Sequence, residues 1–425
     1  MGLGLTGLWR HPDFAKLWVA HTVSGLGTGI TGQALPFTAL LVLGASAGDM
    51  GLLAACAGAP VLLVILFAGV WADRLRRRPI LIVADIGRAA LLVTIPVAAV
   101  LGVLSLGQLF IVAALVESLS LFFNVAYRSY LPTLVQRDRL VEGNSKLSAG
   151  GSVAEISGPA LGGVLVQWLS APFALLFDAA SFLFSALFLG AIRTPEPPPA
   201  PPEHRQSVKS EIGEGLRVVL SNPVLRALAA CSGTFTFFGN FFHALYALYA
   251  VRDMGMPPGI VGVLIGAGGI GALVGAVLVG PITRRFGVGP TLIGSLAFAG
   301  IVGLPIVLVN GPLPLSVAVF FATQLIGDIA ICIYLVTDMS LRQALVPDRL
   351  LGRANASMGF LVGGLGPVGA LLGGLLAELL GARLTLTIAI TAITLAPLWL
   401  FFSPTRTLRE PPIISEEPQG IPAVS

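Results

Sequence analysis

Ionisable side chains inside long apolar stretches are the groups in this sequence best placed to do chemistry. They are Asp85, Arg88, Glu117, Glu155, Asp178, Asp328, His21 and His243. An ionisable group among apolar side chains is costly to keep, so it usually has a function or a specific partner. Apolar surroundings and a nearby like charge both favour the protonated form of a carboxyl group. The chemistry this permits is the uptake and release of protons.

Two of the carboxylates occupy equivalent positions in the two halves of the sequence. Glu117 and Asp328 are separated by 211 residues, an offset that also relates other landmarks of the chain. One carboxylate at the same point of each half favours a shared role in proton coupling. In the structural alternative, each carboxyl group is hydrogen-bonded to a neighbouring helix. Glu155, one turn before a Gly-Pro pair, either serves the proton path or bonds a backbone group.

Composition shows which elements must carry these groups. The chain is 55% hydrophobic and only 11% charged, whereas a soluble domain has about 25% charged residues. This predicts an all-α integral membrane protein, because lipid offers the backbone no hydrogen bonds and each segment must satisfy its own. Cys56, Cys231 and Cys332 lie singly in apolar runs, which suggests neither disulfides nor a metal site.

Twelve apolar spans are long enough to cross a bilayer as helices, at about 20 residues per crossing. Their limits are 17–43, 50–71, 80–104, 107–131, 147–169, 172–192, 227–251, 259–282, 290–310, 313–338, 355–380 and 384–402. Twelve spans place both termini on one side of the membrane. If that side is the cytoplasm, only Arg252 and Arg383 face outward. Arg88 and Arg128 lie in spans, and the remaining 21 of the 25 basic residues face inward, which predicts cytoplasmic termini in the inner (plasma) membrane.

The two halves of the chain repeat each other. At the offset of 211 residues, Gly69 meets Gly280 and Pro79 meets Pro290. Two six-helix halves related in this way are typical of transporters with a site at mid-membrane. We therefore expect bundles at 1–192 and 226–404, a linker at 193–225 with an amphipathic helix on the inner membrane surface, and a disordered cytoplasmic tail at 405–425.

Residues 69–78, GVWADRLRRR, resemble the signature loop of the major facilitator superfamily between its second and third helices. The matching residues include Gly69, Asp73, Arg74, Arg77 and Arg78, whereas Trp71 and Arg76 depart from the pattern. Segments 76–89 and 122–145 resemble the branch that holds macrolide-efflux and enterobactin-export proteins. Residues 157–165, SGPALGGVL, resemble the fifth-helix antiporter motif. Its residues here are Gly158, Pro159, Gly162 and Gly163, although Ala154 replaces the upstream glycine.

This resemblance implies roles for the polar residues. Asp73 and the loop arginines would hold the cytoplasmic gate closed, beyond acting as a topology signal. Helices 1, 4, 7 and 10 would line a central cavity, so that Glu117 and Asp328 face each other. The sixth helix packs against others in this fold, which favours a structural role for Asp178. Polar residues on cavity helices could bind substrate, although a lone histidine is more often a satisfied polar residue: His21, Gln33, Asn240, His243 and Gln324.

Asp85 and Arg88 lie on one face of a helix and can neutralise each other. We expect this charge pair mainly to support the gate loop.

No Gly-rich phosphate loop with a lysine and no metal-ligand spacing occur, so we expect no enzyme, no cofactor and the proton gradient as energy source. The expected function is proton-coupled export of an amphipathic small molecule, either a drug or a siderophore-like metabolite. The expected partners are this substrate, protons and the lipid bilayer, without nucleic acid, and the chain is expected to be a monomer. A facilitator or importer, a lipid transporter and a membrane sensor without transport are the alternatives.

Overall fold

The structure is a computed structural model, and it describes residues 7–60, 76–196 and 208–410. Within these ranges the chain forms helices and no strands. The first group of helices comprises α1 (Pro12–Phe37), α2 (Ala47–Gly58), α4 (Arg77–Val100), α5 (Leu106–Leu134), α6 (Leu140–Leu169) and α7 (Ala171–Gly190). We call this group the N-terminal set.

Helix α8 (Val208–Ser221) precedes a second group of helices. This group comprises α9 (Pro223–Leu248), α10 (Pro258–Phe286), α11 (Val288–Leu308), α12 (Leu313–Leu345), α13 (Asp348–Gly363), α14 (Leu365–Leu380), α15 (Ala382–Leu395) and α16 (Leu398–Phe401). We call it the C-terminal set. In the described part of the chain, 8 helices are long and apolar enough to cross a membrane, or 9 if a bent pair counts as one span. The protein therefore crosses the membrane many times, and the twelve expected spans are consistent with this.

The offset of 211 residues recurs in the helix boundaries. Helix α1 begins at Pro12 and ends at Phe37, and α9 begins at Pro223 and ends at Leu248, which are the same positions 211 residues later. Each of these helices runs into a short π-helix, η2 (Thr38–Val42) and η4 (Tyr249–Asp253), again at the same offset. The internal repeat read from the sequence is thus a repeat of structure.

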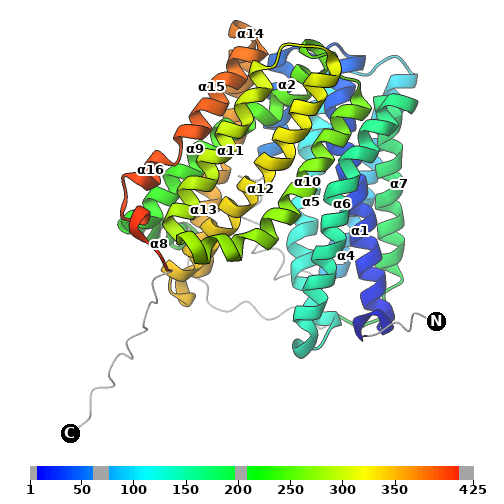
Figure 1. Cartoon of the computed structure of the whole chain (residues 1–425). Coiled ribbons are helices and arrows are strands. Elements are labelled where there is room, and N and C mark those ends of the chain that lie inside the picture. Colours follow the sequence, from blue (N-terminus) through cyan, green and yellow to red (C-terminus); the bar gives the residue numbers. More distant parts are fainter. Residues whose placement is uncertain (1–6, 61–75, 197–207, 411–425) are drawn as a thin grey trace, which may run out of the picture.

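Each set packs within itself along most of its length (Figure 1). In the N-terminal set α1 packs against α6 and α7, and α4 packs against α5 and α7. In the C-terminal set α12 packs against α10 and α11, and α9 packs against α14 and α15. The two sets meet where α6 packs against α10 and where α2 packs against α14. Two helix pairs therefore carry much of the contact between the sets.

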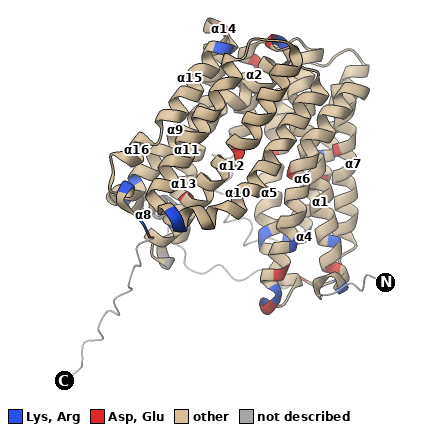
Figure 2. Cartoon of the chain, viewed as in Figure 1, with Lys and Arg blue, Asp and Glu red and all other residues tan. Residues whose placement is uncertain are grey.

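Charged residues gather at one end of the molecule. Figure 2 shows most Lys, Arg, Asp and Glu residues at the end where the described chain begins and ends, with few at the other end and a few acidic residues at mid-height. We call these the terminal end and the opposite end. Arg383 lies at the opposite end, where it donates hydrogen bonds to Val307 O at 2.7 Å and to Asn310 Oδ1 at 2.9 Å.

Two segments between and after the sets differ from expectation. Helix α8 forms where an amphipathic helix was expected, but it packs against α13, and Val219 of its apolar face is buried in the C-terminal set. The expected disorder from residue 405 is wrong for residues 405–410. The carbonyl oxygens of Leu408 and Arg409 accept hydrogen bonds from the first amides of α11, at Gly289 and Val288. Such amides have no partner within their own helix, which explains why the chain is held there.

Candidate functional site

A central cavity of about 560 Å³ lies between the two sets. It is lined by residues of α1, α2, α4, α5 and α7 on one side and of α9, α10 and α12 on the other. Apolar residues dominate the lining. The polar residues in it are Thr28, Thr31, Gln33, Glu117, Ser120, Asp178, Asn240, His243, Tyr246 and Gln324. Four of the five expected substrate residues, Gln33, Asn240, His243 and Gln324, are therefore in one cavity.

A smaller cavity of about 350 Å³ adjoins the first, with Thr28 and Ser120 lining both. It contains His21 and Glu155, so His21 lies in this smaller cavity and not in the central one. The imidazole ring of His21 stacks on the ring of Tyr127, with centroids 4.1 Å apart. Glu155 is exposed and lines the smaller cavity.

Glu117 is half-buried on α5, and its carboxyl group lines the central cavity. Helix α5 begins after Ser105, whose hydroxyl accepts a hydrogen bond from the amide of Gln108 at 3.3 Å. Such an N-cap fixes the start of the helix and hence the depth of Glu117. The charged neighbour of Glu117 is Arg88 of α4, with which it interacts electrostatically.

Asp328 is half-buried on α12 in different surroundings. Its Oδ2 atom accepts a hydrogen bond from Nε2 of Gln324 at 2.6 Å, one turn earlier. It lies against α10 at Gly268, where a methyl group would come within 2.0 Å of Oδ2. Its acidic neighbour is Glu155 of α6, with which it interacts electrostatically. The two repeat-related carboxylates thus differ, since Glu117 is beside a cation and Asp328 is beside an amide and another acid.

Arg88 is the centre of a buried charge cluster in the N-terminal set. It forms an ion pair with Asp85, as the spacing predicted, and donates to Ser120 Oγ at 3.3 Å. The guanidinium carbon lies 4.5 Å from the ring centroid of Phe123 and 4.0 Å from that of Phe182. This arrangement stabilises a cation by cation–π contact as well as by charge.

Asp178 combines a packing role with a place in the cavity wall. The carboxyl group is fully buried and accepts hydrogen bonds from Thr31 Oγ1 at 2.5 Å and Ser181 Oγ at 2.9 Å. It therefore ties α7 to α1, as a structural residue would, and also lines the central cavity and interacts with Arg88. The sequence offered no signal for the place of Asp178 in the cavity wall, because this place depends on the rotation of α7 relative to α1.

The expected gate motif is only partly within the described residues. Gly69, Asp73 and Arg74 lie outside them. Arg78 donates from Nε to the carbonyl of Leu189 at 2.9 Å and from Nη2 to that of Gly190, at the end of α7. Carbonyl groups at a helix end favour such a cation.

Glu196 completes the same corner of the N-terminal set. It accepts hydrogen bonds from the amides of Arg77, at 2.6 Å, and Arg78, at 3.2 Å, at the start of α4. The two described arginines of the motif therefore fasten α4 to α7 and to the start of the linker.

The antiporter motif of α6 forms close helix contacts on two sides. A methyl group on Gly158 would lie 2.9 Å from the Cα atom of Gly29 in α1, and one on Gly162 would lie 2.9 Å from that of Ile30. Gly163 instead faces the other set, where a methyl group would lie 2.9 Å from the Cα atom of Gly262 in α10. The motif thus joins α6 to both sets, which small residues permit.

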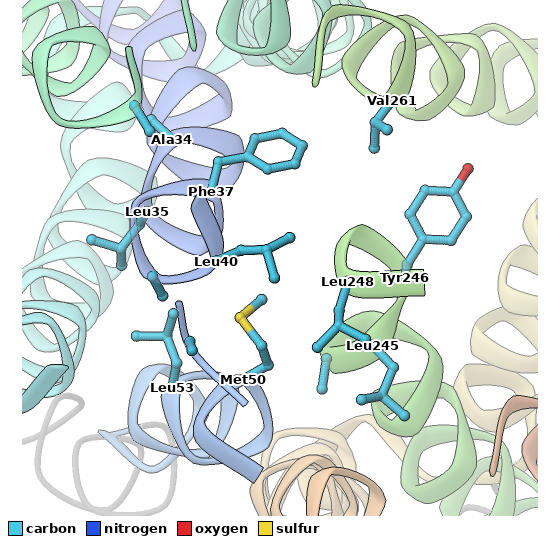
Figure 3. Packing of buried hydrophobic residues seen from close by; sticks show 14 of the residues in the cluster. Ala34, Leu35, Phe37, Leu40, Met50, Leu53, Leu245, Tyr246, Leu248 and Val261 are labelled. Carbon is cyan, nitrogen blue, oxygen red and sulfur yellow. The ribbon is translucent and has the colours of Figure 1, made fainter. Parts of the chain in front are cut away.

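Apolar side chains from both sets form one buried cluster, part of which Figure 3 shows from close by. Phe37, Leu40 and Met50 of the N-terminal set face Leu248 and Val261 of the C-terminal set, and all belong to one buried cluster. The sets are therefore in contact at the opposite end, beyond the central cavity.

A second, partly buried ion pair was missed in the sequence. Asp338 and Arg342 of α12 are paired, and Arg342 also donates to Ser232 Oγ of α9 at 2.9 Å. Their spacing of four residues was visible, but both lie near the end of the expected span. In the described residues, no group of three His, Cys, Asp or Glu side chains could hold a metal ion.

Comparison with known proteins identifies the family that has this architecture. The family description "Major Facilitator Superfamily" matches residues 17–368. The multidrug efflux pump Tap of Mycolicibacterium fortuitum is 29% identical over 394 residues, covering 90% of this chain and 93% of the relative. The enterobactin exporter EntS of Citrobacter koseri is 26% identical over 363 residues, covering 83% and 82%.

Solved structures share the fold. The inward-facing structure of a bacterial homologue of the iron transporter ferroportin is 19% identical, covers 93% of this chain and 99% of its own, and has a TM-score of 0.74. The outward-facing structure of such a homologue gives a TM-score of 0.56. The chain belongs to the Major Facilitator Superfamily and is a multi-pass membrane transporter of a small molecule.

Proposed function

We propose that this transporter is a proton-coupled exporter of amphipathic small molecules. The observation that carries the proposal is the central cavity, whose apolar wall is interrupted by Glu117 and, across the sets, by Gln324, the hydrogen-bond partner of Asp328. An apolar wall binds the apolar part of a substrate, and a few polar groups orient its polar part. Two relatives named as exporters, Tap and EntS, support the direction of transport.

The charges around the cavity suggest how protons couple to transport. Ionised Glu117 is attracted to Arg88, and this attraction is lost when Glu117 takes up a proton. The Asp328 carboxylate accepts a hydrogen bond from Gln324, and taking up a proton changes this contact. Proton binding therefore changes the contacts of each carboxylate. A change of this kind can bias an equilibrium between two arrangements of the sets.

We place the terminal end in the cytoplasm of the cell and the protein in the inner membrane. The excess of basic residues at that end supports this placement. With this orientation the opposite end, where the sets touch, faces outward. The substrate would then enter from the cytoplasm or the inner leaflet and leave after the opposite end opens.

Proteoliposomes with an imposed pH gradient test the proposal. The probes are ethidium, as a lipophilic cation, and enterobactin, as a siderophore. We expect uphill movement of at least one probe against the proton flow, and loss of this movement in Glu117→Gln and Asp328→Asn. Asp253→Asn, at the opposite end in η4, serves as a carboxylate control with retained transport.

The alternatives give different results in the same assay. Equilibration of a probe without response to the gradient would establish a facilitator. Movement of a labelled lipid with neither probe transported would establish a lipid transporter. Gradient-driven transport that persists in both carboxylate variants would remove the assigned proton carriers.

A further inference from the structure

Two hydrogen bonds join the sets at the opposite end, and the internal repeat relates them. The amide of Gly259 donates to Oε1 of Gln167 at 3.1 Å, and the amide of Gly48 donates to Oε1 of Glu378 at 3.1 Å. Adding the offset of 211 residues to Gln167 gives Glu378, and adding it to Gly48 gives Gly259. One contact is therefore built twice, once from each half of the chain.

The glycines are required by this geometry. Each is the second residue of its helix, α2 or α10, where the amides have no partner within the helix. A methyl group on Gly48 would lie 2.6 Å from Oε1 of Glu378, and one on Gly259 would lie 2.3 Å from Oε1 of Gln167. Any side chain there would push the acceptor away from the amide.

A second symmetric contact lies one turn deeper. A methyl group on Gly51 would lie 2.7 Å from the Cα atom of Gly374, and one on Gly262 would lie 2.8 Å from that of Gly163. These four glycines are again two pairs related by 211 residues. The backbones of the two sets therefore touch directly beneath the two hydrogen bonds.

The two hydrogen-bonded contacts differ in charge. Glu378 also accepts a hydrogen bond from the hydroxyl of Ser46 at 2.5 Å, so it binds the start of α2 twice. Gln167 is neutral. An anion is favoured at a helix N-terminus, and hydrogen bonds to an ionised group are roughly twice as strong as neutral ones.

We infer that Gln167 and Glu378 are the residues that hold the opposite end of the transporter closed, and that Glu378 carries the larger share. Each acceptor is on one set and each amide is on the other, so both contacts exist only while the sets touch. They are positioning residues, because they act on the arrangement of the sets and do not contact the cavity. The inference rests on the part of the proposed function in which the sets exchange between two arrangements, and it is independent of the proton carriers.

Distance measurements between spin labels test this directly. In a chain without Cys56, Cys231 and Cys332, one label pair at Val103 and Gly311 reports on the opposite end. A second pair at Val141 and Gly213 reports on the terminal end. All four sites are exposed. Double electron–electron resonance on the purified, reconstituted chain then needs no substrate and no assumption about orientation.

In Glu378→Ala we expect the ratio of open to closed molecules at the opposite end to rise about tenfold, and in Gln167→Ala about threefold. In Glu378→Gln the ratio of open to closed molecules should rise about as much as in Gln167→Ala, because the hydrogen bonds remain and only the extra strength of the ionised acceptor is lost. Gln167→Glu should lower the open fraction. Gln108→Ala is the matched control, since Gln108 bonds Thr94 within the N-terminal set, and it should change nothing.

A contact that holds one end closed must also affect the other end of the molecule. As the opposite end opens, the terminal-end pair should shorten in the same variants. Unchanged distances at the opposite end in Glu378→Ala would overturn the inference. So would broadened distances at both ends with a lower unfolding temperature, because they would show general loosening. Loss of proton coupling in Glu117→Gln would not affect either outcome.

Discussion

Arg88 shows what a single buried charge requires in this fold. It is 3% exposed, and its partner Asp85 is fully buried. Removing one member of a buried ion pair leaves an unpaired charge and costs about 3–5 kcal/mol, whereas an apolar pair of similar volume can be neutral. Asp178 and Glu117 are further acidic neighbours of Arg88, so the free-energy cost of removing one charge depends on the whole cluster.

We therefore expect Asp85→Leu alone to destabilise the purified protein by about 3 kcal/mol, and Asp85→Leu with Arg88→Met to recover much of this loss. Unfolding monitored by intrinsic fluorescence in one detergent measures both variants. A double variant that loses as much stability as the single variants Asp85→Leu and Arg88→Met lose together would show that Asp85 and Arg88 do not stabilise each other.

Asp13 offers a test of charge outside the spans. It accepts hydrogen bonds from Lys16 Nζ at 2.8 Å, from Thr194 Oγ1 at 2.6 Å and from the amides of Thr194 and Arg193. Burial alone would raise its pKa, but these hydrogen bonds outweigh burial and hold the pKa of Asp13 well below its usual range. The stability that Asp13 contributes is present above the unfolded pKa of about 3.9 and is lost only as pH falls through the lower folded pKa.

Asp13→Asn should therefore lower stability by about 1–2 kcal/mol. The difference from the unmodified chain should stay constant between about pH 5 and pH 8. Thermal unfolding at several pH values measures this difference. A difference that shrinks on moving from pH 8 to pH 5 would mean that the carboxyl group protonates in that range.

Residue-level reasoning from sequence found what is visible along one helix. The Asp85–Arg88 pair followed from its spacing, and the offset of 211 residues singled out Glu117. Contacts between helices could not be found in this way. The bond from Thr31 to Asp178 depends on the rotation of α1 against α7, and no periodicity within a single segment specifies it.

Among the helices, α6 carries the closest packing. Its Gly158 lies against Gly29, whereas Gly151, two turns earlier on the same helix, has open space where a side chain would begin. Small residues at one face let helix backbones approach in a membrane, where apolar burial gives little drive for association. The antiporter motif can therefore be understood first as a packing motif.

Gly158→Ala should destabilise the protein by about 1–3 kcal/mol through overpacking. Gly151→Ala should be neutral or stabilising by about 0.5–1 kcal/mol, because alanine is the better helix former. Parallel thermal unfolding of the two variants checks this. Equal effects at the two positions would mean that α1 and α6 do not pack as closely as described.

Element-level prediction succeeded where hydropathy and repetition agree. The positions of α5 and α12 follow from both signals. It failed for residues 405–410, because the partner that orders them is the start of α11, more than 100 residues away in sequence. The prediction for α8 was incomplete, because the sequence does not say whether an apolar helix face contacts lipid or protein. Part of the apolar face of α8 packs against α13.

The molecule as a whole is a pair of repeated sets that touch from the opposite end as far as the middle of α6 and α10. The close glycine contacts between α2 and α14 and between α6 and α10 lie at the opposite end, with the central cavity beyond them. This is the arrangement expected when the terminal end gives access to the cavity. The orientation of that end in the cell is a separate question and can be tested alone.

Single cysteines in the same cysteine-free chain should label differently in intact cells. Gly311→Cys should react with an impermeant maleimide, and Gly213→Cys on α8 should react only after the cells are opened. Both positions are exposed, so access depends on the side of the membrane. Labelling of Gly213→Cys but not Gly311→Cys in intact cells would place the termini outside.

The central claim, that Glu117 and Asp328 carry the protons coupled to transport, is tested most directly by proton release from purified protein. Ethidium or enterobactin is added to the protein in weak buffer, and the pH change is recorded. The proposal predicts protons released by the unmodified chain, fewer by Glu117→Gln or Asp328→Asn, and none by the double variant. Each variant is measured at a saturating probe concentration, because an amide resembles the protonated acid and should bind the probe more weakly. Release by the double variant equal to that of the unmodified chain would contradict the claim and make Glu155 the next carrier to test.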